Sequence, residues 1–289
     1  MTDTCPPHSR MNMEDRQCMF YEFKKLCLRR EIYILLCICV FFASVAFLEE
    51  VVKNAGTPCA LLPSASEAGM LWESGIGSVY IYIMPFIASA CYVDSYFTEL
   101  GSQYIAIDIT RSGKKYFTRK YVVVLIAGFF VSMLAPLINL LLCNVTFPIR
   151  MPRAVETGSV YTISIEREMQ WVLFPQLYIS RPSMYAFLHI CLLGIMGGLI
   201  SGLSYCFSLF YRKNIVITIG SGGILYLILT MSASVFGKFS LAPFHYFLLR
   251  PSGYTKSITI FIIMNGLILF ASIVLLILKE ITYKDILSE

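Results

Sequence analysis

The chain has 289 residues, of which 57% are hydrophobic and only 14% are charged, and its formal net charge is +5. A soluble domain carries roughly 25% charged residues, and a single soluble core stops growing at about 250 to 300 residues, so this composition argues against a soluble globular protein. The basic residues fall in short clusters beside apolar runs rather than on one polar face, which argues against a nucleic-acid partner.

The N-terminal segment, residues 1–31, is polar and charged. It contains no short apolar core followed by a small-residue cleavage site, so we expect no removable signal peptide. Its last part reads MFYEFKKLCLRR, and its apolar residues recur at helical spacing: Phe20, Phe23, Leu26 and Cys27. This pattern predicts an amphipathic helix at the membrane interface. The alternative is a solvated basic lead-in that only fixes the orientation of the chain.

Six apolar segments follow that are long enough, or nearly so, to cross a bilayer, because about 20 residues at 1.5 Å of rise cover about 30 Å of hydrocarbon. They are residues 32–48, 76–96, 121–143, 184–211, 215–236 and 258–278. We therefore predict an all-α polytopic membrane protein. Residues 32–278 are expected to form a six-helix transmembrane domain, with a short tail at 279–289.

The distribution of Lys and Arg predicts the orientation of these segments. If the N-terminus is inside, fifteen of the 23 basic residues lie on the inner side and eight on the outer side. Cytoplasmic loops retain positive charge, so both termini are predicted to be cytoplasmic and the location is predicted to be the cytoplasmic membrane.

Asp94, near the inner end of the second segment, is the clear acid within the predicted spans. A carboxylate in a membrane is a functional candidate by default. Its depth is interfacial rather than central, which leaves two interpretations open: a structural partner in the basic inner loop, or a proton relay.

The fourth segment is rich in small residues, which predicts a face that lets a neighbouring helix approach closely. These residues are Gly194, Gly197, Gly198, Ser201, Gly202 and Ser204. Ser204 also fits the loose GxSx pattern of intramembrane serine proteases, with His245 as its base. The two residues are expected at opposite depths of the membrane, so we do not predict this pair.

Other chemistry is sparse. No Walker A motif occurs, and the GSGG run from Gly220 to Gly223 lacks a phosphate-binding lysine, so these glycines are expected to give a close contact or a flexible point. The ten cysteines include no CxxC pair. We expect no catalytic site, cofactor or metal in this chain, and any ATP must be hydrolysed by another one.

Four segments resemble the permease subunits of bacterial ABC-2 type exporters, especially the six-span permeases of Gram-positive bacteria. They are MFYEFKKLCLRREIYILL from Met19, YVDSYFTELGSQYIAIDITRSGKKYFTRKYVVVL from Tyr92, RPSMYAFLHICLLGIMGGLISGLSYCFSLFYRKN from Arg181, and FSLAPFHYFLLRP from Phe239. The likeness covers most of the chain in order. It implies the ABC-2 permease fold, similar to type V exporters, with a broken outer helix between the last two spans.

In that family the second of these segments is a cytoplasmic loop whose coupling helix contacts the ATPase. The resemblance implies an ATPase-coupling loop that contains Glu99, Gly101, Tyr104, Thr110, Arg111 and Tyr116, between Asp94 and Lys120. Many relatives carry a Ser-Arg element in this loop with a proline just before it. This chain lacks the proline, and here Ser112 follows Arg111 instead. The departure leaves the path of the loop open.

The resemblance implies the permease subunit of an ATP-driven exporter for a lipid, peptide, drug or similar substrate. Its implied partners are a separate ABC ATPase, which would hold ATP and Mg, a second permease chain of the same or a related sequence, and the lipid bilayer. One alternative is an ATP-independent channel or secondary carrier, which should show repeated halves or charges at mid-membrane. Another is a peptide-sensing or immunity subunit.

Overall fold

The computed structural model describes residues 19–58, 62–72, 74–96, 115–149, 171–211, 214–249 and 254–288. Within these ranges the chain forms helices joined by turns, without a strand. Five described helices are long and apolar enough to cross a membrane. They are α2 (Arg30–Lys53), α6 (Lys115–Thr146), α9 (Pro182–Ser208), α10 (Ile215–Val235) and α12 (Ile258–Ser288). The chain is therefore a multi-pass membrane protein.

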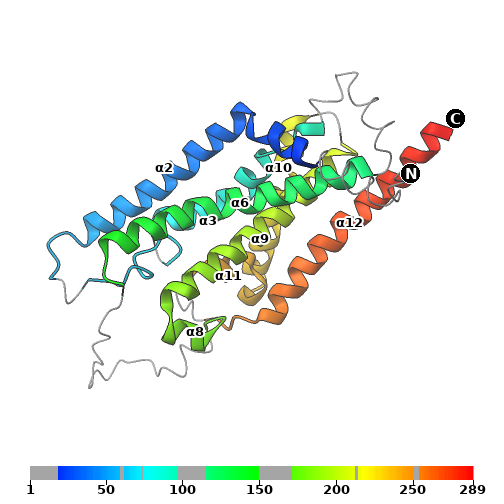
Figure 1. Cartoon of the computed structure of the whole chain (residues 1–289). Coiled ribbons are helices and arrows are strands. Elements are labelled where there is room, and N and C mark those ends of the chain that lie inside the picture. The colour runs from blue at the N-terminus through cyan, green and yellow to red at the C-terminus, as the bar shows by residue number, and fades with distance from the viewer. Residues whose placement is uncertain are drawn as a thin grey trace, which may run out of the picture.

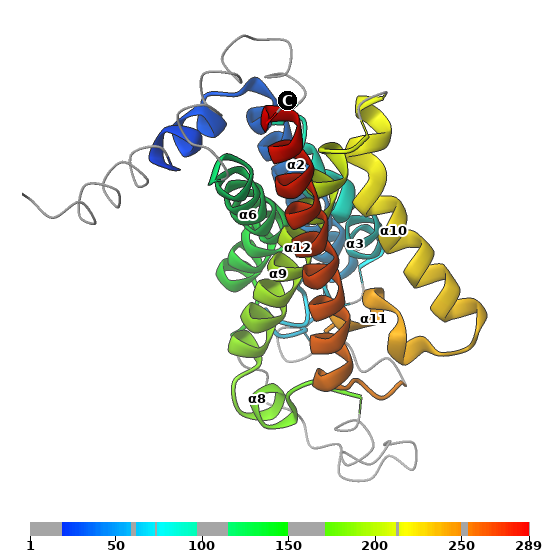
Figure 2. The same cartoon turned by 90° about the vertical axis from the view of Figure 1, so that its right-hand side faces the viewer.

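The long helices alternate in direction and form one bundle (Figure 1). Helices α2, α6 and α10 run away from the end of the bundle that holds the start of α2 and the last turns of α12, and α3 (Gly75–Ala90), α9 and α12 return to it. We call this the terminal end and the opposite one the far end. Figure 2 shows the same arrangement from the side, with α8 (Pro175–Ser180) at the far end.

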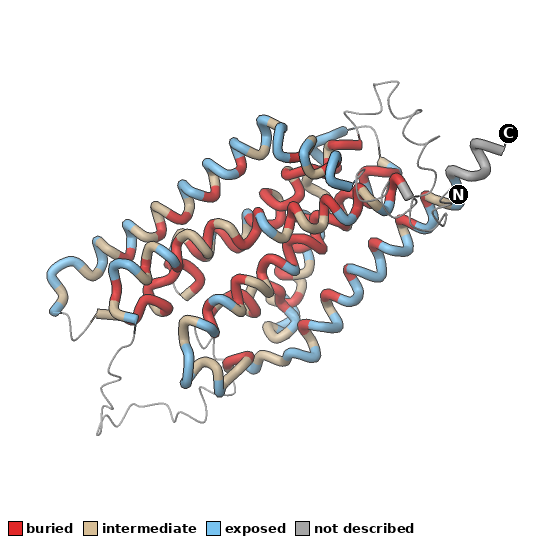
Figure 3. Tube along the Cα trace, in the orientation of Figure 1, coloured by how far each residue is buried: buried red, intermediate tan, exposed pale blue. Residues whose placement is uncertain are grey.

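Helix α9 is the centre of the bundle. It packs most extensively on α6 and also contacts α3, α10 and α12. In its most apolar stretch 67% of the residues are buried inside the protein, compared with 22% for α2 and 28% for α10 and α12. Figure 3 shows the difference as mostly buried positions along the inner helices and exposed positions along the peripheral ones. The peripheral helices therefore offer their apolar outer faces to lipid.

The small residues of α9 allow its close approach to α6, as predicted. A Cβ added at Gly194 would lie 2.9 Å from the ring of Phe129, and one at Gly198 would lie 2.7 Å from the carbonyl oxygen of Leu125. The close contact predicted for α10 is also confirmed, because a Cβ at Gly222 would overlap Ser204 Oγ and lie 2.7 Å from the carbonyl oxygen of Ile200. Any side chain at these positions would force the helices apart.

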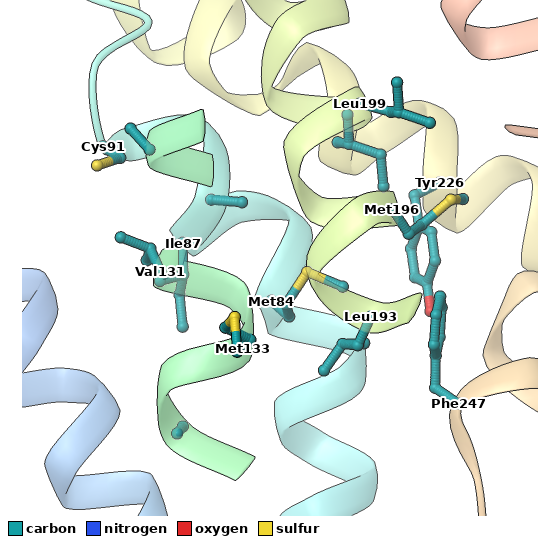
Figure 4. Close-up of a cluster of buried hydrophobic side chains, with 14 of the residues drawn as sticks. Met84, Ile87, Cys91, Val131, Met133, Leu193, Met196, Leu199, Tyr226 and Phe247 are labelled. Atoms are coloured by element: carbon teal, nitrogen blue, oxygen red, sulfur yellow. The ribbon is translucent and has the colours of Figure 1, made fainter. Parts of the chain in front are cut away.

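Side chains of α3, α6, α9, α10 and α11 (Pro243–Phe247) fill the middle of the bundle (Figure 4). The buried residues drawn there include Met84 and Ile87 of α3, Leu193 and Met196 of α9, and Tyr226 of α10. Met adapts to irregular gaps because it is unbranched and flexible. This packing gives the helices a common core that does not depend on lipid.

Helix α3 is shorter than the predicted second span, 76–96. Ser74 Oγ accepts from the Gly77 amide at 2.8 Å and caps its start, and the chain turns at residues 91–94 instead of continuing. The 16 residues of the helix rise about 24 Å, less than the hydrocarbon core. Apolarity continues to Tyr96, but the turn brings polar side chains of this segment onto other elements. The count of six membrane crossings stays a prediction.

Helices α6 and α12 are longer than the spans predicted at 121–143 and 258–278. Both continue past the apolar run at the terminal end, where Thr118 Oγ1 donates to Glu280 Oε1 at 2.9 Å. Hydropathy predicts where an apolar run ends, whereas Lys, Arg and Glu are good helix formers and prolong the helix itself. The tail predicted at 279–289 is therefore helical up to Ser288.

Short elements close the far end between α10 and α12. They are the 3₁₀ helix η2 (Phe239–Leu241) and α11 (Pro243–Phe247). Pro243 occupies the first turn of α11, where its missing N–H costs nothing. Tyr246 and Phe247 are buried against the bundle. The connection is thus a broken helical segment packed into the protein.

Candidate functional site

A helix forms at residues 19–27, as predicted, and lies at the terminal end beside the start of α2. Of its predicted apolar face, Leu26 is buried against the bundle, whereas Phe20 and Cys27 are exposed. Leu28, which follows the helix, is exposed as well. Exposed aromatic and aliphatic side chains beside lysines suit a membrane interface, but the interfacial position stays a prediction.

Polar contacts join this helix to the chain that follows α3. Tyr92 Oη donates to Glu22 Oε2 at 2.7 Å, and the guanidinium of Arg29 lies 4.7 Å from the centre of the Tyr92 ring. Arg29 Nη1 in turn donates to Asp94 Oδ1 at 2.8 Å. The contacts run Glu22, Tyr92, Arg29, Asp94, and we call these four residues the terminal clasp.

Asp94 therefore has a structural partner. Among the described residues its cation is Arg29, just before α2, and a further partner in the basic inner loop stays a prediction. Both side chains are 14% exposed, so water screens the pair only in part, and its charge-assisted hydrogen bond is stronger than an ordinary surface ion pair. The turn after α3 makes this pair possible, because it brings Asp94 back toward the start of α2.

The start of α6 contributes an aromatic and cationic group next to the clasp. The ammonium of Lys120 lies 4.9 Å from the centre of the Tyr116 ring, although Lys120 is only 1% exposed. Tyr116 meets Phe117 edge to face, and the Phe117 ring lies 6.1 Å from Tyr96. Tyr116 is thus packed within the chain, and Tyr96 and Phe117 hold together the two ends of the predicted coupling loop.

The other predicted loop residues lie outside the described part of the chain. They are Glu99, Gly101, Tyr104, Thr110 and Arg111. Their role in docking an ATPase stays a prediction. The structure describes the base of the loop: the chain leaves at Tyr96, beyond the clasp, and re-enters at α6.

The clasp leads to a prediction about the N-terminal helix. We expect Arg29→Asp or Asp94→Arg to place like charges together and release residues 19–27. The buried thiol of Cys91 lies near Cys27 and Arg29, so this release is expected to expose it. Loss of a charge-assisted bond of about 1.5–3 kcal/mol corresponds to at least about a tenfold faster alkylation of Cys91. Site-resolved mass spectrometry of the alkylated protein measures this rate.

The double exchange of Arg29 and Asp94 restores the opposite charges and is expected to return the rate toward that of the native chain. Lys24→Asp is the matched control, because it makes the same charge change on the exposed side of the same helix. Equal rates in the native chain and in both single variants would show that the pair does not hold the helix.

The serine and histidine of the rejected protease pair lie in different environments. Ser204 Oγ lies 3.0 Å from Ser89 Oγ and accepts from the Gly222 amide at 3.0 Å, inside the bundle. His245 belongs to α11 at the far end, where its ring contacts Phe239 and Tyr254. Ser204 therefore links α3, α9 and α10, and the structure does not bring the two residues together.

The far end contains a cavity that the sequence did not reveal. It has a volume of about 260 Å³ and is lined by residues of the 62–72 segment, of α8 and of the start of α9. Its side chains include Glu67, Trp72, Tyr178 and Tyr185. These residues are spread over more than a hundred positions in no recurring motif. The one sequence signal was the pair of prolines, Pro175 and Pro182, which begin the two helices that carry the tyrosines.

A partly buried cation lies beside this region, in the connection before α12. Lys256 Nζ donates to the carbonyl oxygen of Leu248 at 2.6 Å, and burial lowers the pKa of this amine to about 8. Burial and the nearby Lys256 charge both lower the pKa of His245. At neutral pH the far end therefore holds a lysine that is mostly protonated and a histidine that is mostly neutral.

No protein-family model, curated protein or solved structure matches this chain.

Proposed function

We propose that this chain is the membrane-spanning permease subunit of an ATP-driven exporter of the ABC-2 type. In this proposal a separate ATPase subunit docks at the terminal end, which faces the cytoplasm, and a second permease chain completes the pathway. The proposal rests on the resemblance of the four segments described above, together with features of the terminal end.

The observation that carries the proposal is the terminal clasp and its position. A permease must transmit motion of a docked ATPase to its membrane helices, so its docking loop needs rigid connections. Glu22, Tyr92, Arg29 and Asp94 join the N-terminal helix, the start of α2 and the end of α3. The predicted coupling loop begins directly after this clasp and ends at α6, whose first turn is packed through Phe117 against Tyr96.

Two further features support the proposal. The segment FSLAPFHYFLLRP, which resembles the family's broken outer helix, forms η2 and α11 with Tyr246 and Phe247 buried. The small-residue face of α9 packs closely on α6. The two helices thus form the rigid centre that transmission of motion from a docked ATPase to the membrane helices requires.

The mechanism follows from these connections. Closure of the ATPase dimer on ATP would push the loop at residues 97–114, and the clasp would carry the displacement to α2 and α3 together. In the family arrangement spans one, two and five line the path, which correspond here to α2, α3 and α10. Their movement as a unit would switch access from the terminal end to the far end.

Affinity purification of the tagged chain from its native membrane, in mild detergent, tests the proposal directly. We expect a stoichiometric subunit with Walker motifs to co-purify and to hydrolyse ATP. If the purified chain reproducibly lacks an ATPase and supports flux without ATP in vesicles, the exporter proposal fails and the secondary-carrier alternative takes its place.

A second prediction concerns the coupling loop itself. We expect Glu99→Lys and Arg111→Glu to lower ATP hydrolysis by the complex at least about tenfold, since reversing a charge that fixes the register of an interface costs several kcal/mol. The matched control is Lys238→Glu, an exposed charge at the far end. Both loop variants should melt at the temperature of the native chain. Native hydrolysis rates in both would remove these two residues from the docking site.

A further inference from the structure

The far-end cavity has a wall of aromatic rings. Trp72 and Tyr178 are almost parallel, with ring centres 6.2 Å apart, and Tyr185 meets Tyr178 edge to face at 5.3 Å. Tyr185 rests in turn against His189 at 4.5 Å, deeper in the bundle. The faces of Trp and Tyr carry the negative part of the ring quadrupole and attract cations.

The cavity has one charged side chain among its described lining residues, the carboxylate of Glu67. Glu67 Oε2 accepts from the amide and the hydroxyl of Ser64 at 3.0 and 2.8 Å, and these two bonds fix the carboxylate in place. Its other oxygen, Oε1, makes no hydrogen bond to the residues that the structure describes. The carboxylate of Glu67 is therefore held in place by Oε2, and its Oε1 can accept a hydrogen bond from a ligand or contact a cation.

Tyr185, in the wall of the cavity, is 2% exposed, and its hydroxyl makes no hydrogen bond by geometry within the described ranges. A buried hydroxyl without a partner costs free energy that a bound ligand or water recovers. Lys256, the partly buried cation of this region, is not among the described lining residues.

From this combination we propose that the far-end cavity binds an organic ammonium group, with Glu67 as its counter-ion and Trp72, Tyr178 and Tyr185 as its aromatic walls. Its volume of about 260 Å³ suits a headgroup-sized cation rather than a drug-sized molecule. Ile179 and Ser180 on its rim are exposed, so the cation enters from the far-end surface. The binding site is a property of the chain alone and does not rest on the exporter proposal.

The chain contains its own reporter for this binding. It has two tryptophans, Trp72 in the cavity and Trp171. In the Trp171→Phe variant all tryptophan emission comes from Trp72. We expect choline, added to this full-length variant in nanodiscs of phosphatidylglycerol, to change the emission in a saturable way. The neutral isostere of choline, in which carbon replaces the quaternary nitrogen, is expected to produce no such change.

Glu67→Gln in the same background keeps the size of the side chain and its ability to accept from Ser64, but removes the charge. We expect it to weaken choline binding at least about tenfold. The matched control is Glu49→Gln, which removes a carboxylate at the same end that accepts from the amides of Gly75 and Ile76. An amide oxygen can keep the shorter of these two contacts, from the Gly75 amide, and Glu49 is not among the described lining residues of the cavity. Choline affinity is therefore expected to stay within about twofold of the parent.

A parallel titration replaces phosphatidylglycerol with phosphatidylethanolamine and distinguishes a soluble amine from a lipid headgroup. A Glu67-dependent response to choline assigns a soluble ammonium ligand, and a Glu67-dependent response to phosphatidylethanolamine alone assigns a lipid headgroup. Either result supports the proposal. The proposal is overturned if neither ligand changes the emission, if Glu67→Gln responds as strongly as its parent, or if the neutral isostere binds equally well.

Discussion

Gly197→Ala is expected to destabilise the protein by roughly 3 kcal/mol, because α9 and α6 meet here without space for a methyl group. A Cβ at Gly197 would overlap the side chain of Ser132, with its Cβ 2.5 Å away, and would lie 3.2 Å from Met84 Sδ. Ser132 Oγ donates to the Gly128 carbonyl at 2.7 Å, so its movement also breaks a buried hydrogen bond. Thermal unfolding in detergent, followed by loss of the monodisperse peak, measures the change.

Gly266→Ala is the matched control, because no atom lies within 4 Å of a Cβ added at Gly266 in α12. Alanine is the better helix former, so this variant should melt at the native temperature or slightly above it. Adding Ser132→Gly to Gly197→Ala removes the overlapping atoms and is expected to recover part of the loss. A native melting temperature for Gly197→Ala would show that α6 and α9 are not as close as the structure places them.

Asn139→Leu is expected to cost roughly 2–3 kcal/mol, because the Asn139 amide fastens two other segments to α6. Its Oδ1 accepts from the Met70 amide at 2.7 Å, and its Nδ2 donates to the Ala43 carbonyl of α2 at 3.1 Å. Leucine fills a similar volume but leaves the Met70 N–H buried without an acceptor. The same melting experiment measures the loss.

Asn144→Leu provides the comparison for Asn139, one turn further along α6. Its Nδ2 donates to the Leu140 carbonyl of its own helix, so the bond joins no second segment. We expect a change within about 0.5 kcal/mol of the native chain. If the two leucine variants melt together, the Asn139 contacts do not hold α2 and the 62–72 segment in place.

The sequence predicted the helical bundle because long apolar runs admit few other structures in lipid. It also predicted the face of α9 that packs on α6, since Gly194, Gly198 and Gly202 recur on one side of a helix. Features that depend on periodicity and composition were therefore accessible without a structure. The ABC-2 resemblance, the ATPase partner and the orientation of the termini stay predictions.

Helix ends and long-range polar pairs were not accessible in this way. The predicted second span ran to Tyr96, but the helix ends at Ala90 because Tyr92 and Asp94 turn to meet Glu22 and Arg29. Each of these bonds joins residues at least 65 positions apart, and no local pattern encodes them. The far-end cavity was missed for the same reason, because Glu67 and Tyr178 come together only through the fold.

Helices α6 and α12 extend beyond their apolar runs at the terminal end, so their ends lie some distance from the hydrocarbon core of the membrane. Beyond the apolar run of α12, residues 279–288 continue as helix for about 15 Å, and α6 begins about 9 Å before its own apolar run. The Debye length at physiological ionic strength is about 8 Å. The headgroup layer itself takes up about 5–7 Å of this length. The end of α12 therefore lies about one Debye length beyond the headgroups and the start of α6 lies closer to them, so a soluble partner that docked on both ends would respond to the side chains of this chain and to the charge of the membrane.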